Sequence, residues 1–303
     1  MIVAVTGATG LIGSALAGAL EADGHLVRRI VRPPARAQEH DIRWDPAAGT
    51  IDAVELGGVD ATVHLGGANV AGHRWTKSYK AQIRDSRVLG TRLLCKTIAG
   101  MLTKPAVMLS ASAVGYYGDR GDEQVDESSP PGRGFLADVC QQWEAETTAA
   151  RDAGVRVVNL RFGVVLSREG GALAQMLTPF KLGVGGVIGS GRQYISWIAL
   201  DDAVRVIKFA LQAAAIAGPV NAVAPDPVTN RQFTETLGRV LGRPTVMPMP
   251  AFAARLAFGE MADEMLLTGV RALPHALKNA GFAFQHSQLE QALRHILNHT
   301  SVP

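Results

Sequence analysis

The sequence predicts an α/β fold in which a doubly wound parallel sheet takes up most of the chain and a smaller, mainly helical region follows it. Over the first two-thirds of the chain, short β-rich runs alternate with longer segments of helical periodicity, whereas residues 251–303 carry helical patterns. Strands that alternate with helices form βα units and pair in parallel. We therefore expect a sheet domain over residues 1–228 and a helical module over residues 229–303.

The expected strands are short apolar runs, and they cover residues 2–5, 26–31, 42–44, 61–65, 106–109, 156–160 and 220–223. Apolar residues at helical spacing predict helices, which cover residues 11–22, 77–100, 135–153, 202–214 and 229–241. Thr229 and Gln232 have the spacing of a capping box. Asp201 and Asp202 are expected to be N-cap residues of the helix that follows them. Glycine-rich loops are expected at 118–134 and, with a short helix, at 163–196.

Composition bounds the class of protein. Hydrophobic residues make up 47% of the 303 residues and charged residues 19%, which is typical of a globular chain. The net charge is +3 with no run of Lys and Arg, so we expect no nucleic-acid partner. No uninterrupted apolar stretch reaches the roughly 18 residues that a membrane span needs, so we expect no membrane partner. The oligomeric state stays open.

Cysteine usage and the N-terminus indicate the compartment. Cys95 and Cys140 match no zinc or redox spacing, and two reduced thiols fit a cytosolic protein. The first strand starts at once, without the basic segment of a signal peptide. The expected location is therefore the cytoplasm. His64, His73, His275 and the other histidines form no cluster with ligand spacing, so no metal is expected.

The strongest motif lies between the first strand and the first helix. Residues 6–13 read Thr-Gly-Ala-Thr-Gly-Leu-Ile-Gly, which places Gly7, Gly10 and Gly13 three apart. In a strand–turn–helix context, such glycines permit a tight turn, close approach of a pyrophosphate and close helix–strand packing. The amides at the helix start then face the phosphates. A Rossmann-type dinucleotide site is expected here, with contacts from Gly7, Thr9, Gly10, Leu11, Ile12 and Gly13.

The residues after the second expected strand predict which dinucleotide binds. A site for NAD places Asp or Glu about 20 residues beyond the motif to bind the ribose 2′-hydroxyl. Here Arg32 follows Gly13 by 19 residues, and Arg36 lies close behind. A guanidinium suits a 2′-phosphate, so NADP(H) is the expected cofactor. The alternative is that both arginines are solvated surface charges.

Several motifs together resemble the extended short-chain dehydrogenase/reductases, and more narrowly their epimerase-like NADP-binding branch, often labelled nucleoside-diphosphate-sugar epimerases. The matching segments cover nearly the whole chain and are residues 6–13, 64–69, 74–75, 110–118, 179–183, 188–191, 197–198 and 221–225. The resemblance implies further cofactor contacts from Leu65, Gly66, Gln82, Arg87 and Val165. For Leu65 and Val165, burial in the core is the alternative. It also implies that the insertion at about 166–198 lies on the substrate side.

The catalytic pattern of the superfamily is missing. That pattern is Tyr-x-x-x-Lys, in which the lysine lowers the tyrosine pKa so that the phenol exchanges a proton with substrate. No tyrosine here has a lysine four residues later, and the expected place, 135–139, reads Phe-Leu-Ala-Asp-Val. The candidate substitutes are Ser112, at the end of the fifth strand, and the phenols of Tyr116 and Tyr117, with Arg120 as a doubtful charge partner of Tyr116. A packing role for Tyr116 is equally open, and Asp138 is expected to be a solvated helix residue.

Two further departures concern the substrate side. Relatives often carry Glu where Ala68 stands and His where Ala199 stands. Two hypotheses follow: an NADP(H)-dependent oxidoreductase or epimerase acting on an unknown small molecule, or a sensor or scaffold that holds NADPH without turnover. The missing Tyr–Lys pair favours the sensor. The retained loops and C-terminal module favour the enzyme.

Overall fold

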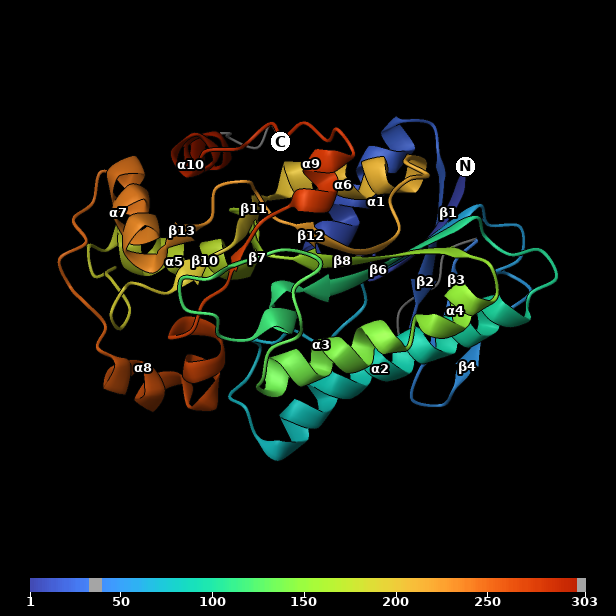
Figure 1. The fold of residues 1–303 in the computed structure, drawn as a ribbon, viewed down its shortest axis with the longest axis horizontal. Coiled ribbons are helices and arrows are strands. Elements are labelled where there is room, and N and C mark those ends of the chain that lie inside the picture. The colour runs from blue at the N-terminus through green and yellow to red at the C-terminus, as the bar shows by residue number, and fades with distance from the viewer. Residues whose placement is uncertain (33–39, 299–303) are drawn as a thin grey trace. The chain divides into compact units, whose positions relative to one another are not determined.

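The computed structural model describes residues 1–32 and 40–298 and divides into two compact units (Figure 1). The first unit contains Met1–Ser112, Asp138–Leu160 and Val204–Val220. The second contains Ala113–Ala137, Arg161–Ala203 and Asn221–Pro303. Within the described residues, no helix is both long enough and apolar enough to cross a bilayer.

One eight-stranded sheet organises the first unit, in the order β12-β8-β6-β5-β1-β2-β3-β4. Its strands are β1 (Ile2–Thr6), β2 (Leu26–Val31), β3 (Ile42–Asp45), β4 (Thr50–Ile51), β5 (Ala61–His64), β6 (Val107–Ala113), β8 (Arg156–Phe162) and β12 (Gly218–Ala222). β1 pairs in parallel with both β2 and β5, and β4 pairs antiparallel with β3. The strand order therefore reverses at β1, as in a doubly wound Rossmann-type sheet. The predicted fold class is confirmed.

Helices cover both faces of this sheet, which explains why β1, β5 and β6 are almost continuously buried. The helices are α1 (Leu11–Ala22), α2 (Lys77–Gly100), α3 (Phe135–Ala145), α4 (Thr148–Asp152) and α6 (Leu200–Gln212). Figure 1 shows α1 and α6 on one face and α2 and α4 on the other. Buried side chains of α2 at Leu94 and Ile98 pack with Trp44 of β3 and Met108 of β6 in one core.

Two predicted boundaries in this unit were wrong. The single helix expected over 135–153 is split into α3 and α4 at residues 146–147, where the amide and the hydroxyl of buried Thr147 both donate to the Glu144 carbonyl oxygen, at 3.1 and 2.7 Å. The strand expected to end at residue 109 continues to Ala113. Ser110 and Ser112 interrupt the apolar run, yet both lie buried within β6.

The second unit joins short strands to small helices. Its strands β7 (Gln124–Val125), β9 (Val164–Leu166), β10 (Tyr194–Ile195), β11 (Trp197–Ala199), β13 (Val228–Thr229) and β14 (Arg271–Ala272) form two-stranded pairs. Its helices are η1 (Val114–Tyr117), α5 (Gly171–Lys181), α7 (Asn230–Leu241), α8 (Ala251–Phe258), η2 (Ala262–Leu266), α9 (His275–Asn279) and α10 (Leu289–Asn298). Leu173, Trp197, Phe233 and Leu293 belong to its main core. The capping box of Thr229 and Gln232 at the start of α7 is confirmed.

Candidate functional site

The glycine turn connects β1 to α1 at the switch point of the sheet. Gly7 has φ +67°, the left-handed region that favours glycine. Its carbonyl oxygen accepts a hydrogen bond from the Gly10 amide at 2.9 Å. A Cβ on Gly13 would stand 2.1 Å from the same oxygen, so any side chain at Gly13 would force the turn away from the helix.

The start of α1 is suited to bind an anion. Its N-cap residue, Gly10, provides no side-chain cap, and the first turn carries no acidic residue. The amides of Leu11, Ile12 and Gly13 precede the first intrahelical bond, which runs from the Ser14 amide to the Gly10 carbonyl oxygen. Thr9 and Gly10 are exposed at this point. Free first-turn amides and the positive end of the helix dipole fit the pyrophosphate of a dinucleotide.

The connection that leaves β5 toward α2 lies directly against the glycine turn. The Thr6 hydroxyl oxygen accepts the amides of Leu65 and Gly66, each at 3.0 Å. A Cβ on Gly7 would meet the Leu65 backbone at 3.0 Å. The structure therefore brings Leu65 and Gly66 together with the glycine turn. Thr6 also contacts Nδ1 of buried His64 at 2.8 Å, and burial together with Arg87 lowers the pKa of His64 to about 4.

Arg32 follows β2 at the same edge of the sheet. Ile30 is paired with Thr6, so Arg32 lies just beyond the register position at which β1 enters the turn. Its side chain is exposed. The carboxylate of Asp41, just before β3, is bound by Arg29, whose Nε lies 2.8 Å from Oδ1. Arg36 lies outside the described residues.

The two predicted residues on α2 differ in their surroundings. Gln82 is exposed. Arg87 donates from Nη1 to the carbonyl oxygens of Ala68, at 3.1 Å, and Ile83, at 3.0 Å. Its guanidinium lies 5.1 Å from the ring centroid of Trp143, and burial lowers its pKa. Arg87 thus fixes the segment that follows Gly66, which gives it a structural role beside the predicted contact with cofactor.

Ser112 has a partner that the sequence analysis missed. Ser112 is 3% exposed, and its hydroxyl donates to Oε1 of Glu144 on α3 at 2.6 Å. A carboxylate at this distance orients the hydroxyl and can take up its proton. Asp138, on the same helix, is exposed as expected. The signal for Glu144 in the sequence is weak, because it lies 32 residues from Ser112 and belongs to no motif.

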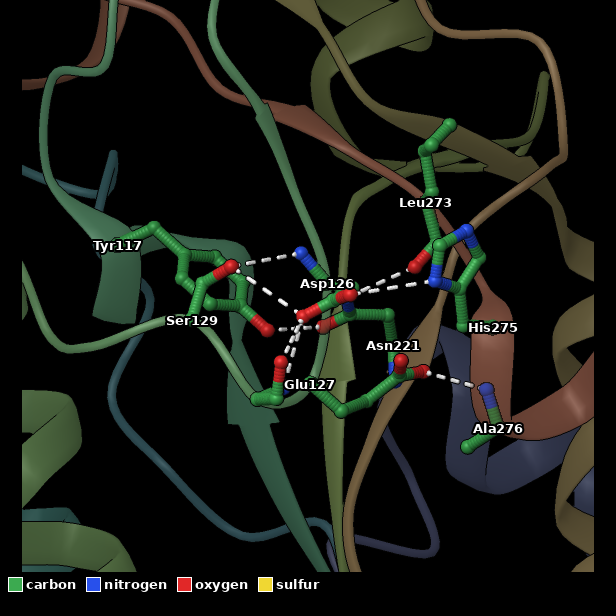
Figure 2. Close-up of polar contacts among 9 residues, drawn as sticks. Tyr117, Asp126, Glu127, Ser129, Asn221, Leu273, His275 and Ala276 are labelled. Atoms are coloured by element: carbon green, nitrogen blue, oxygen red, sulfur yellow. Dashed lines mark hydrogen bonds and ion pairs between the residues drawn. The ribbon is translucent and has the colours of Figure 1, made fainter.

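In the second unit, Tyr117 is a structural residue. Its buried hydroxyl donates to Oδ1 of Asn221 at 2.7 Å and accepts from Nη1 of Arg161 at 2.9 Å (Figure 2 draws the first contact). Burial raises the pKa of Tyr117 to about 12. The phenol is therefore held in its protonated form between two buried partners, which favours a structural role.

The loop expected over 118–134 is anchored by its acidic residues. Oε1 of Glu127 accepts the backbone amides of Asn221, at 3.0 Å, and Ala276, at 3.2 Å. Oδ2 of Asp126 lies 3.2 Å from Nδ1 of His275 (Figure 2). This loop contains β7, which pairs with β14. It is therefore tied to the segment that carries α9.

Tyr116 remains a candidate catalytic residue, but its charged partner is Arg161 and not Arg120. The Arg161 guanidinium lies 3.5 Å from the centroid of its ring. The suggested pairing of Tyr116 with Arg120 was wrong, because η1 ends at Tyr117 and helical spacing stops there. Arg120 donates to the carbonyl oxygens of Tyr117 and Pro130 instead. Val165, also in the second unit, lies on β9 opposite Ile198.

The parallel sheet and the glycine turn at its switch point define an extended short-chain dehydrogenase/reductase fold. Residues 3–222 match the NAD dependent epimerase/dehydratase family. Residues 249–296 match a domain of unknown function, DUF1731. The chain therefore belongs to the NAD dependent epimerase/dehydratase family, and the resemblance that the motifs indicated is confirmed.

Curated relatives and one solved structure match nearly the whole of this chain. An epimerase family protein of Mycobacterium bovis is 48% identical over 292 residues, 96% of each chain. The human epimerase family protein SDR39U1 is 37% identical over 300 residues, 98% of this chain and 100% of the human one. The crystal structure of human SDR39U1 (isoform 2) with NADPH superposes with a TM-score of 0.89 and 36% identity, covering 99% of this chain and 100% of that one.

Proposed function

We propose that this chain is an NADP(H)-binding, atypical short-chain dehydrogenase/reductase that acts as an oxidoreductase or epimerase on a small molecule still to be identified. One observation carries the choice of cofactor. Exposed Arg32 follows β2 at the edge of the sheet that holds the glycine turn, while Asp41 is bound by Arg29. An exposed guanidinium there favours a 2′-phosphate over a 2′-hydroxyl. The NADPH in the human relative's structure supports the same choice.

The proposed roles follow from the contacts. The first-turn amides of α1 bind the pyrophosphate, Arg32 binds the 2′-phosphate, and Leu65 and Gly66 border the adenine side. When bound, the nicotinamide supplies hydride chemistry. Ser112, oriented by Glu144 at 2.6 Å, donates to or accepts from a substrate oxygen. In the oxidative direction, Ser112 accepts the substrate hydroxyl proton and passes its own proton to Glu144; in the reductive direction both transfers reverse, and Glu144 supplies the proton that the missing Tyr–Lys pair would otherwise exchange.

The alternative function is an NADPH-holding sensor or scaffold without turnover. The observation that favours it is the sequence Phe-Leu-Ala-Asp-Val at 135–139, where neither a phenol nor an ammonium is present. The two functions share the cofactor and differ in the reaction. The cytoplasmic location and the unknown small-molecule substrate stay predictions in either case.

Titrations of the purified chain with NADPH and with NADH test the cofactor, with nicotinamide fluorescence as the signal. We expect the parent to prefer NADPH, and Arg32→Asp to lose that preference by about 10- to 100-fold, because a guanidinium–phosphate pair becomes a repulsive one. Arg151→Asp is the matched control. It makes the same charge change on α4, which precedes β8 and so lies toward the opposite edge of the sheet. Equal preference in the parent and in Arg32→Asp would contradict the assignment.

A panel of carbonyl compounds and nucleotide sugars, incubated with the NADPH-loaded protein, tests for turnover. If the enzyme function is right, cofactor oxidation or epimerisation occurs with at least one compound. Ser112→Ala and Glu144→Gln should then each lower kcat while NADPH affinity stays at the parental value. Tight NADPH binding without turnover across the panel would favour the sensor.

A further inference from the structure

Two histidines and one aspartate gather in the second unit, outside the proposed cofactor site. Asp201 lies in the first turn of α6, His286 lies before α10, and His295 lies within α10. One possible ligand atom from each residue lies within 4.8 Å of the others. Across residues 1–32 and 40–298, this is the one group of three or more His, Cys, Asp or Glu side chains close enough to hold a metal ion.

Both imidazole rings face the same carboxylate oxygen. Nε2 of His295 lies 2.8 Å from Oδ2 of Asp201, and Nε2 of His286 lies 3.9 Å from it. The first distance is that of a hydrogen bond, but the second is too long for one. Ligand atoms on a tetrahedral Zn²⁺ stand about 3.3 Å apart, given metal–ligand bonds of roughly 2.0–2.2 Å. The two distances bracket this value, and the ligand nitrogens of the two imidazoles lie within 4.8 Å of each other, so the side chains would close around the ion.

The neighbouring residue fixes one ligand in place. Asp202 is fully buried and accepts the backbone amides of Gln285, at 3.0 Å, and His286, at 2.8 Å. The expectation that Asp201 and Asp202 are N-cap residues was wrong, because α6 begins at Leu200 and both lie inside its first turn. The Asp202 carboxylate binds a remote segment instead. His295 is held by α10, whose residues Leu289 and Leu293 are buried in the core. The ligands therefore stand on anchored backbone, as a metal site requires.

The site is open to a metal ion and to water. The side chain of Asp201 is 55% exposed, that of His295 34% and that of His286 13%. Because Asp201 and His295 are partly exposed, a water molecule can be the fourth ligand and the ion can enter from solvent. Two imidazoles and one carboxylate suit Zn²⁺, Ni²⁺ and Cu²⁺ better than Mg²⁺ or Ca²⁺.

We propose that Asp201, His286 and His295 bind one divalent transition-metal ion, with Zn²⁺ as the reference ligand. Asp201 belongs to the segment that matches the epimerase family, and both histidines belong to the segment that matches DUF1731. A bound ion would therefore cross-link the two matched segments and stabilise the attachment of α10 to α6. The sequence predicted no metal, because Asp201 lies 85 residues before His286, and the nine-residue spacing of His286 and His295 fits no ligand motif.

Calorimetric titration of the full chain with ZnCl₂, without a histidine tag and after removal of bound metal, tests the proposal. We expect one Zn²⁺ per chain and a higher Tm in its presence. His286→Gln and His295→Gln should each weaken binding by about 10-fold or more, since each removes a ligand. His275→Gln is the matched control, because His275 pairs with Asp126 in the same unit without a second histidine beside it. Its Zn²⁺ affinity should equal that of the parent.

A second readout uses the unmutated chain, so it does not depend on whether a variant folds. In nitrogen-15 spectra of the histidine rings, Zn²⁺ should shift the ring nitrogens of two histidines and leave the others in place. Absence of saturable one-to-one binding would overturn the proposal. So would binding that persists when both histidines are replaced, or a spectrum in which the affected rings are not those of His286 and His295.

Discussion

The glycine turn of the first unit and the polar cluster around Tyr117 in the second unit are built in opposite ways. The turn is contiguous, with Gly7 and Gly13 meeting across one short segment. The cluster joins Tyr117 to Asn221 across 104 residues and Glu127 to Ala276 across 149. A contiguous site depends on backbone conformation, which residue type dictates locally. A dispersed site depends on tertiary packing, which no local pattern encodes.

The largest effect that this comparison predicts is at Gly13. In Gly13→Ala, the new Cβ would meet the Gly7 carbonyl oxygen at 2.1 Å, so the turn must shift. We expect a stability loss of about 3 kcal/mol in urea unfolding, as for severe overpacking, and NADPH binding too weak to measure. Gly18→Ala on the same helix is the control, since its Cβ meets nothing within 4 Å. It should gain about 0.5–1 kcal/mol. Similar midpoints for the two variants would refute the assigned role of Gly13.

The second-largest loss of stability is expected in the polar cluster around Tyr117. Tyr117→Phe removes the hydroxyl that lies between Asn221 and Arg161 and leaves both buried groups short of a partner. The expected cost is about 1–3 kcal/mol in urea unfolding. Tyr116→Phe keeps the ring against Arg161 and should stay close to the parent in stability. If Tyr116 exchanges a proton with substrate, Tyr116→Phe will keep the parental stability but lose turnover. The two measurements thus distinguish a structural role for Tyr117 from a catalytic role for Tyr116.

This contrast also sets what could be predicted from sequence. The parallel sheet, the glycine turn and the position of Arg32 follow from alternation, motif spacing and strand order, all of which are properties of short segments. Glu144 could not be predicted, because its contact with Ser112 depends on how α3 packs along β6. The anchoring of the backbone at His286 by Asp202 depends in the same way on the placement of α10. Such contacts are fixed by packing, after the local elements have formed.

His64, which is buried beside the glycine turn, makes the stability of the first unit depend on pH. Its pKa falls to about 4 in the folded chain, against about 6.5 in an unfolded one. The unfolded state therefore binds more protons between these values, so stability is complete above pH 6.5 and is lost as the pH falls toward 4. From pH 7 to pH 5, the loss attributable to this residue is about 2 kcal/mol. Urea unfolding at both pH values should reveal it, and His64→Gln should reduce the difference by that amount. A variant with the parental pH dependence would count against a neutral, buried His64.

The smallest effect compares two helix starts, one in each unit. Thr229 caps α7 within a capping box, since its hydroxyl accepts the Gln232 amide and the Gln232 side chain accepts the Thr229 amide. Thr76 caps α2 by accepting the Tyr79 amide, but the Tyr79 hydroxyl donates to the Asn69 carbonyl oxygen rather than returning the bond. Both threonine-to-alanine variants should lose about 1 kcal/mol in urea unfolding. Gln232→Ala should cost a fraction of that, because it removes the two contacts that Oε1 accepts from Thr229 but leaves the Thr229 hydroxyl on the backbone amide of residue 232. If Gln232→Ala cost as much as Thr229→Ala, the reciprocal bond would matter as much as the cap. The spacing that predicted this helix start from sequence would then also account for its stability.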